Sequence, residues 1–424
     1  MENTFEKELS VIKKKLAAFG QEQLLPPADA AGVYGGSALR EYLGVLEKID
    51  FEQMNELYRF ARETSSGGEG SISPIPVTVA AALSERKRAR LFAKGEKILR
   101  EGGFAAVTMA GGQGTRLGHD GPKGTYDIGV AERSLFGIQA KRLLRRAELS
   151  SCPQIPWYIM TSGENDAQTR DFFRANGYFG YSEDNVRFFT QFMLPMVDFD
   201  GLIVRDAPMH VKQGADGHGG IFRAMHRHGI VSDMRARGVK YVFIGGIDNV
   251  LVKLCDPLFI GFTADGGYGA AGKSLIKRDP REKAGVFCLR DGRPHVVEYT
   301  EITEEMAEAV DGNGDYIYGD AHILCNMFSI GMLETAGEKG LPYHVAVKKT
   351  KYIDREGILR EPDAPNAYKF EAFIFDAFSQ CGNMGILRVK REDEFAPVKN
   401  REGEDSPETA RALYESALRR GALD

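Results

Sequence analysis

The stretch MAGGQGTRLGHDGPKG, residues 109–124, combines six glycines with one arginine and one lysine. Glycine at this density weakens both helix and strand, so we expect a loop of successive turns. Backbone N–H groups in such a loop can converge on an anion, and the missing Cβ atoms let phosphate oxygens approach the backbone. Arg116 can hold a pair of oxygens, Lys123 adds a compact charge, and Pro122 stiffens the turn that aims the lysine. These residue types indicate phosphate binding.

Two familiar phosphate-binding patterns fit the chain less well. The dinucleotide pattern G-x-G-x-x-G fails in this loop because Leu117 stands at the third glycine position and Gly118 comes one residue late. The stretch GYGAAGKS (267–274) fits G-x-x-x-x-G-K-[ST], but only SLIK follows before RDPREKAG, so no long helix can begin there. A glycine turn leading into a short strand is expected instead. A merely flexible surface loop at 109–124 is the remaining alternative, and it does not explain the paired cations.

The elements around the loop follow an α/β pattern. The apolar run FAAVTMA (104–110) predicts a buried strand that ends at the loop, and similar runs predict strands at 156–162, 186–191 and 241–249. Helical spacing is expected for 2–19, 37–64, 84–101, 133–146, 166–177, 369–381 and, with Ser406 as N-cap, 406–420. Strands that alternate with helices imply a largely parallel sheet, and ligands bind beyond the carboxyl ends of such strands. The glycine loop has that position.

The length and composition limit the class of protein. A chain of 424 residues is too long for one ordinary core, and shifts in character predict segments 1–98 (mostly helical), 99–340 (α/β) and 341–424. The net charge of −5 gives no general attraction to nucleic acid or to anionic lipid. Signal-peptide character and long apolar runs are absent from the sequence, the five cysteines form no C-x-x-C pair, and the histidines show no zinc-ligand spacing. We therefore expect a cytoplasmic protein without membrane or nucleic-acid partners.

Several stretches, taken together, resemble one enzyme family. AGGQGTRLG with PKG is similar to the signature of the UDP-sugar pyrophosphorylases, the type-1 uridylyltransferases, and the likeness is greatest to the eukaryotic-type UDP-N-acetylglucosamine pyrophosphorylases. Further matching stretches, spread over nearly the whole chain, are IPWYIMTSG (155–163), MLPMVDFDG (193–201), IDNVLVKLCDPLFIGF (247–262), VVEYTEIT (296–303), LPYHVAVKK (341–349), KREDEFAPVKN (390–400) and SPETAR (406–411). The resemblance implies a glycosyltransferase-A-like (Rossmann-like) mixed sheet in a catalytic domain, 99–340, with a smaller helical domain before it and an α+β domain after it.

The resemblance also implies a reaction and its residues. UTP and a sugar 1-phosphate would give a UDP-sugar and pyrophosphate, with Mg²⁺ as cofactor, and the enzyme would be a monomer or a weak homo-oligomer. Catalytic roles are implied for Arg116, Lys123 and Lys399, and the metal ligand is Asp248. The implied nucleotide contacts are Ala110, Gly111, Gly112, Gly114, Thr115, Gln191 and Gly217, and the implied sugar contacts are His218, Glu298, His322 and Lys369.

Two departures from the family pattern fall among the sugar contacts. Acetylglucosamine enzymes carry D-G-N-G-G where this chain has DGHGG with His218, and UDP-glucose enzymes carry G-H-G there. GDAHI places His322 where a sugar-contacting asparagine is expected. The whole-chain likeness favours N-acetylglucosamine 1-phosphate as the substrate, with glucose or galactose 1-phosphate as the alternative. A catalytically silent nucleotide-sugar sensor is the alternative of another class, and Arg116, Lys123 and Asp248 together argue against it.

Overall fold

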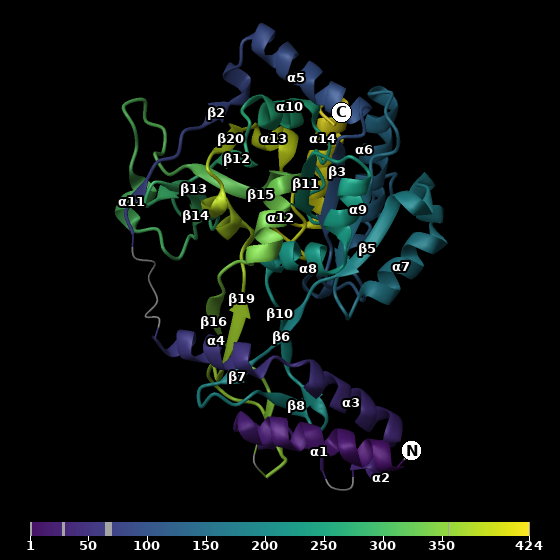
Figure 1. The fold of residues 1–424 in the computed structure, drawn as a ribbon. Coiled ribbons are helices and arrows are strands. Elements are labelled where there is room, and N and C mark those ends of the chain that lie inside the picture. Colours follow the sequence, from purple (N-terminus) through teal and green to yellow (C-terminus); the bar gives the residue numbers. More distant parts are fainter. Residues whose placement is uncertain (1, 28–29, 64–69, 355, 424) are drawn as a thin grey trace. The chain divides into compact units, whose positions relative to one another are not determined.

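The apolar runs form a large mixed β-sheet in the computed structural model, which describes residues 2–27, 30–63, 70–354 and 356–423 (Figure 1). In spatial order the strands are β2 (Thr78–Val79), β20 (Met384–Arg388), β12 (Ala270–Ile276), β15 (Asp320–Ser329), β11 (Tyr241–Gly246), β3 (Phe104–Met109), β4 (Trp157–Thr161) and β5 (Val186–Thr190). β11, β3, β4 and β5 are parallel, whereas β15 runs antiparallel to β11 and to β12. β13 (Val286–Arg290) joins β15 to β14 (Arg293–Val297) and β1 (Ile72–Ser73).

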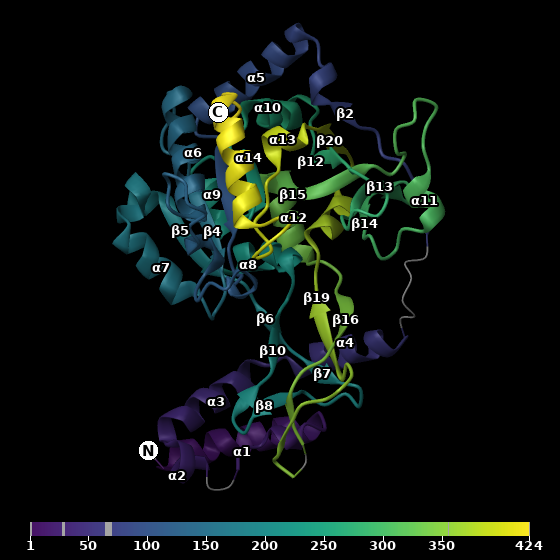
Figure 2. The ribbon, with the colours of Figure 1, turned by 180° about the vertical axis from the view of Figure 1, so that it is seen from behind.

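Helices cover both faces of this sheet. One face carries α5 (Glu85–Arg100), α6 (Leu135–Leu149), α10 (Pro257–Asp265) and α14 (Pro407–Arg419), and the other carries α8 (Ile221–Arg227), α9 (Ile230–Ala236) and α12 (Ile330–Lys339) (Figures 1 and 2). α7 (Asp166–Ala175) packs against β5. Short helices α11 (Glu304–Glu308) and α13 (Arg391–Glu394) lie in the connections. α14 begins as the sequence predicts, with Ser406 and Thr409 forming a capping box. No helix within the described ranges is long and apolar enough to cross a membrane.

The chain groups into two compact units rather than into three consecutive segments. Unit 1 comprises Met1–Gly67, Phe192–His218 and Pro342–Phe373, and unit 2 comprises Gly68–Gln191, Gly219–Leu341 and Ile374–Asp424. The structure thus differs from the expected segments 1–98, 99–340 and 341–424. α5 belongs to unit 2 because it packs on α10, and the C-terminal residues from Ile374 onward complete the sheet through β20.

Unit 1 combines helices with small sheets. Its helices are α1 (Glu2–Ala18), α2 (Ala30–Tyr34), α3 (Gly36–Lys48) and α4 (Phe51–Glu63). Its strands are β6 (Met193–Pro195), β7 (Val197–Asp198), β8 (Arg205–Ala207), β9 (His210–Val211), β10 (Gln213–Ala215), β16 (His344–Lys348), β17 (Tyr352–Ile353), β18 (Leu359–Arg360) and β19 (Ala367–Glu371). β16, β19 and β7 form one sheet, and the buried Leu16, Leu46 and Phe370 share the core of this unit.

Two of the predicted helices are wrong in detail. The single helix expected over 37–64 is two helices, α3 and α4, because the chain turns at Asp50, whose carboxylate accepts from the N–H of Gln53 at 3.0 Å; residue 64 lies outside the described ranges. The helix expected over 369–381 is the end of β19 followed by a 3₁₀ helix, Ile374–Gln380. β19 pairs with β16 along its length, and these hydrogen bonds override the local helical spacing.

Backbone-to-backbone packing of α5 on α10 gives a test of the fold. A Cβ on Gly261 would lie 1.8 Å from the carbonyl oxygen of Leu91. Gly261→Ala is therefore expected to lower the free energy of unfolding, measured by urea denaturation, by about 3 kcal/mol. The clash of the added methyl group with α5 outweighs the gain of about 1 kcal/mol in helix propensity. Gly331 in α12 has open space around its Cα, so Gly331→Ala is the matched control and should be neutral or stabilising. Equal effects in the two variants would contradict this packing.

Candidate functional site

The glycine loop leaves the carboxyl end of β3, between β11 and β4, and its own backbone hydrogen bonds fix its shape. The N–H of Gly114 donates to the carbonyl of Gly121 at 2.9 Å, and the N–H of Lys123 donates to the carbonyl of Gly112 at 3.1 Å. Gly118 and Gly121 adopt φ angles of +70° and +138°, which favour glycine. The loop is thus a folded double turn, and the alternative of a merely flexible loop does not describe it.

Gln191 and Gly111, both predicted nucleotide contacts, lie together. Gln191 follows β5, and its amide would be 2.9 Å from a Cβ placed on Gly111. Only glycine leaves room for the glutamine side chain at this point. Gly112 has open space around its Cα, so a ligand can approach the backbone there. Thr115 begins the short 3₁₀ helix Thr115–Leu117 that carries Arg116.

Asn165 holds the beginning of the loop, and the sequence reasoning did not identify it. This fully buried side chain donates to the carbonyl of Ala110 at 3.0 Å and to that of Gly112 at 3.3 Å. Its own oxygen accepts from the N–H of Ser162 at 2.8 Å, so β4 and the loop are joined through one amide. The sequence signal was weak, because an asparagine before α7 also suits a helix N-terminus.

The predicted catalytic cations interact electrostatically with one another, and one of them, Lys123, pairs with Asp248. Lys123 Nζ lies 3.9 Å from Asp248 Oδ2, and both side chains are partly exposed. Burial lowers the pKa of Lys123, the nearby charges of Arg116 and Lys399 lower it further, and Asp248 opposes the shift. The structure therefore brings Arg116, Lys399 and Asp248 within electrostatic range of Lys123, and these four residues form one charged cluster.

Lys399 reaches this cluster because Asn249 ties the C-terminal segment to the end of β11. The Asn249 amide donates to the carbonyl of Glu394 at 2.7 Å and accepts from the N–H of Ala396 at 2.9 Å. The N–H of Val398 then donates to the carbonyl of Asp248 at 2.9 Å. These contacts align residues 396–398 with the aspartate, and they join positions about 150 residues apart that the sequence pattern did not connect.

Asp405 is a second carboxylate near the cations. Its Oδ2 lies 3.4 Å from Lys399 Nζ, and its carbonyl accepts from the N–H of Lys399 at 2.7 Å. The φ angle of Asp405 is +57°, a conformation that non-glycine residues rarely adopt. The turn thus holds the lysine by both backbone and side chain.

A buried polar chain supports the backbone next to Asp248. Trp157 Nε1 donates to Thr108 Oγ1 at 2.8 Å, and that hydroxyl donates to Gln139 Oε1 at 2.7 Å. Gln139 Nε2 in turn donates to the carbonyl of Gly246 at 3.1 Å. These hydrogen bonds link β4, β3 and α6 to Gly246, the last residue of β11. They therefore fix the position of the backbone that leads from β11 to Asp248.

His322 and Glu298, predicted sugar contacts, both lie next to Gly285. The N–H of His322 donates to the carbonyl of Gly285 at 2.9 Å, and a Cβ on Gly285 would be 3.2 Å from Glu298 Oε1. His322 Nε2 contacts Asn326 Oδ1 at 3.0 Å. Burial lowers the pKa of His322 to about 4, so its ring is neutral at pH 7.

Gly217, His218 and Lys369 belong to unit 1. Gly217 has a φ of +85°, and a Cβ there would be 2.3 Å from the carbonyl oxygen of Ala372. The ring of His218 lies 5.4 Å from that of Phe373, centroid to centroid. Lys369 pairs with Glu371 at 2.8 Å. Within this unit, the loop that contains Gly217 and His218 therefore packs against the residues at the end of β19.

Asp248 is the metal ligand that the family resemblance implies. Among the described residues, no group of three or more His, Cys, Asp or Glu side chains could hold a metal ion. A partly exposed carboxylate that faces a phosphate-binding loop nevertheless fits Mg²⁺, which is commonly held by one or two carboxylates together with substrate phosphates.

The P-loop-like stretch 267–274 is structural. Lys273 lies in β12, is fully buried, and donates to Asp256 and Glu394 rather than facing a ligand. The predicted turn and short strand are confirmed.

The chain is similar in sequence and in structure to known proteins. The family described as "UTP--glucose-1-phosphate uridylyltransferase" matches residues 77–404. UDP-N-acetylglucosamine pyrophosphorylase of Saccharomyces cerevisiae is 38% identical over 398 residues, covering 88% of this chain and 83% of that protein. UDP-N-acetylhexosamine pyrophosphorylase-like protein 1 of Homo sapiens is 37% identical over 438 residues, covering 97% and 86%. The crystal structure of uridine diphosphate N-acetylglucosamine pyrophosphorylase from Trypanosoma brucei has a TM-score of 0.82 at 30% identity, covering 98% of this chain and 87% of that one.

Proposed function

The chain belongs to the UTP–glucose-1-phosphate uridylyltransferase family of nucleotidyltransferases, and we propose that it makes UDP-N-acetylglucosamine and pyrophosphate from UTP and N-acetylglucosamine 1-phosphate. The proposal is carried by Lys123, which lies beside Asp248 at the glycine loop and within electrostatic range of Arg116 and Lys399. The choice of sugar rests on the relatives of 37–38% identity, whose names specify N-acetylglucosamine or N-acetylhexosamine.

The cation cluster suits an in-line displacement at the α-phosphorus of UTP. A phosphate oxygen of the sugar 1-phosphate forms the new P–O bond, and the bond to the departing pyrophosphate breaks. Such a step needs positioning and charge neutralisation rather than a protein nucleophile. Lys123 would hold the α-phosphate as its charge builds, and Arg116 would stabilise the leaving β- and γ-phosphates. Lys399 would add charge on the same side of the loop.

Mg²⁺ would be held by Asp248 and by phosphate oxygens of the nucleotide. When bound, it neutralises phosphate charge and orients the oxygens it contacts. Asp248 also faces Lys123, so the carboxylate keeps the lysine charged against the cost of burial.

The uracil ring would lie against the start of the loop. Gln191 offers both a hydrogen-bond donor and an acceptor, and it sits directly on the backbone of Gly111. The backbone of Ala110 and Gly112 is held in place by Asn165. In this arrangement the Gln191 amide and a rigid stretch of backbone would form hydrogen bonds to the edge of the uracil ring.

The sugar would meet Glu298 and His322. Glu298 offers an acceptor for a hydroxyl. His322 is neutral and its Nε2 contacts the Asn326 amide oxygen, so Nδ1 is the ring nitrogen that could accept from a sugar hydroxyl. His218 and Lys369 of unit 1 are further proposed sugar contacts.

One assay tests the proposal directly. The protein is incubated with UTP, Mg²⁺ and each sugar 1-phosphate in turn, and pyrophosphate release is measured. Release should be fastest with N-acetylglucosamine 1-phosphate. Faster release with glucose or galactose 1-phosphate would overturn the choice of sugar, and no release with any sugar would favour the sensor alternative.

His218→Asn is expected to shift preference further toward the acetylated sugar. Gain or loss of one hydrogen bond is worth about 1.4 kcal/mol, or about tenfold in the ratio of kcat/KM values for the two sugars. His210→Asn changes an exposed histidine of the same unit and serves as the control. An unchanged ratio in His218→Asn would show that this residue does not set specificity.

A further inference from the structure

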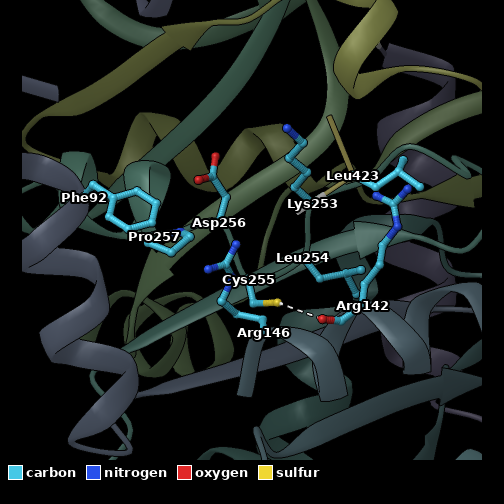
Figure 3. Close-up of a pocket in the computed structure, with 9 residues that line it drawn as sticks. All are labelled: Phe92, Arg142, Arg146, Lys253, Leu254, Cys255, Asp256, Pro257 and Leu423. Carbon is cyan, nitrogen blue, oxygen red and sulfur yellow. Dashed lines mark hydrogen bonds between the residues drawn. The ribbon is translucent and has the colours of Figure 1, made fainter. Parts of the chain in front are cut away.

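A pocket of about 50 Å³ in unit 2 lies outside the proposed substrate site (Figure 3). Phe92, Leu254, Pro257 and Leu423 give it apolar walls. None of its lining residues is among those assigned above to the nucleotide, the sugar or the metal.

Cations dominate the polar part of this pocket. Arg142 and Arg146 come from α6, Lys253 comes from the segment after β11, and Asp256 is the one carboxylate in the lining (Figure 3). Asp256 is already bound to Lys273 Nζ at 2.8 Å. Arg146 is likewise paired, with Glu96 at 3.3 Å, so Arg142 is the lining cation for which no ion pair is found among the described residues.

The lysine of the pocket is only loosely compensated. The carboxylate found near Lys253 Nζ is that of Glu394, at 3.9 Å, which is beyond hydrogen-bond distance. Both oxygens of Glu394 already accept from Lys273 at 2.9 Å. Among the described residues, Lys253 Nζ therefore makes no short hydrogen bond to a carboxylate.

Arg142 has an unused hydrogen-bonding edge. Its Nη1 donates to the carbonyl of Val252 at 2.7 Å, and its guanidinium lies over the ring of Tyr414, 5.8 Å from the centroid. Its Nε and Nη2 atoms are buried and have no hydrogen-bond partner among the described residues. These two nitrogens form the edge with which arginine grips an oxyanion. A buried, unpaired guanidinium edge is costly, and burial lowers the pKa of Arg142 accordingly.

We propose that this pocket is a second anion site, which binds a small phosphate-bearing ligand through Arg142 and Lys253, independently of UTP. The charged groups take the phosphate, and the walls formed by Phe92 and Leu254 accept an apolar part of the ligand. Because the Arg142 edge is closed to solvent, binding requires this side chain or that of Leu423 to turn.

Calorimetric titration with inorganic phosphate tests the site. The titrated protein is the full chain with Arg116→Ala and Lys123→Ala, which removes the two loop cations proposed to bind UTP, and ionic strength is held constant with chloride. We expect one saturable site. In this background, Lys253→Met and Arg142→Met should each weaken phosphate binding at least tenfold. Arg145→Met, which removes an exposed cation of the same helix, should leave it unchanged.

Two results would overturn the proposal. One is the absence of saturable phosphate binding in the background protein. The other is equal affinity in Lys253→Met and in the Arg145→Met control. Lys253 has a partly exposed side chain without a close partner, so its variant decides the question even if Arg142→Met fails to fold. Neither result depends on turnover, so failure here is distinguishable from failure of the proposed function.

Discussion

Lys123→Met should lower kcat/KM for UTP by about 10²–10³-fold, the usual cost of removing one group that stabilises transition-state charge. Lys123 is partly buried in the glycine loop, 3.9 Å from Asp248, so its charge acts in a medium that screens it less than water does. Methionine keeps the unbranched apolar stem of the side chain and removes the charged ammonium group. Steady-state pyrophosphate release with N-acetylglucosamine 1-phosphate measures the effect.

The control for this variant is Lys94→Met, which removes an exposed lysine of α5 that pairs with Asp265. It should leave kcat/KM within about twofold of the parent value, because surface ion pairs contribute about 0–1 kcal/mol. If Lys123→Met retained activity close to that of Lys94→Met, the lysine would not act on the transition state. Coinciding unfolding curves for both variants would establish that the fold is intact.

The pH dependence gives an independent signature of the same lysine. In the proposed mechanism the charged form of Lys123 is the active one, and burial together with Arg116 and Lys399 lowers the pKa of Lys123. The kcat/KM of the free enzyme should therefore fall on the alkaline side at a pH below the ordinary lysine range of about 10.4. Lys123→Arg should move this fall to higher pH, because a guanidinium stays protonated. An alkaline fall at the same pH in both proteins would assign it to another group.

The residues around Lys123 show which parts of the site are visible in the sequence. Glycine spacing predicted the loop, and the apolar run before it predicted β3, because both signals are local. Asn165 and Asn249 were missed for the opposite reason. Each acts by hydrogen bonds to backbone carbonyls 53–55 and 145 residues away, respectively. Such partners depend on the folded path of the chain, and no spacing rule within one segment encodes them.

The segment 369–381 shows how a local signal can mislead. Phe370, Phe373, Ile374, Ala377 and Phe378 follow helical spacing, which favours the helix that the sequence predicted. In the structure Phe370 belongs to unit 1 and Phe378 to unit 2, so the apolar residues serve two different cores. The pairing of β19 with β16 and the change of unit after Phe373 depend on contacts that are distant in the sequence. These contacts determine that the segment is a strand followed by a 3₁₀ helix.

Lys273→Met should cost about 3–5 kcal/mol of unfolding free energy, because it leaves two buried carboxylates without their cation. Lys273 is fully buried, and its Nζ lies 2.8 Å from Asp256 and 2.9 Å from both oxygens of Glu394. These contacts join β12 to the segments that lead to α10 and to Lys399. A typical domain has a total stability of about 5–15 kcal/mol, so the loss would be readily measured by urea unfolding.

Lys277→Met is the matched control for this loss. Lys277 is also buried and lies just after the same strand, but it donates to the carbonyl of Pro280 at 3.0 Å rather than to a carboxylate. Its replacement should cost about 1 kcal/mol, the value of one hydrogen bond. Equal losses for Lys273→Met and Lys277→Met would mean that the buried charges contribute nothing beyond packing.

The loss in Lys273→Met should also depend on pH. Burial raises the pKa of Glu394 even beside Lys273, and removal of the lysine should raise it further. A carboxyl group whose pKa is raised by folding is tolerated when protonated and destabilises the fold as pH rises through that pKa. The difference in stability between Lys273→Met and the parent should therefore be smaller at about pH 5 than at about pH 8. Glu394→Gln in the Lys273→Met background should recover stability at pH 8, and no recovery would assign the loss to Asp256 or to packing.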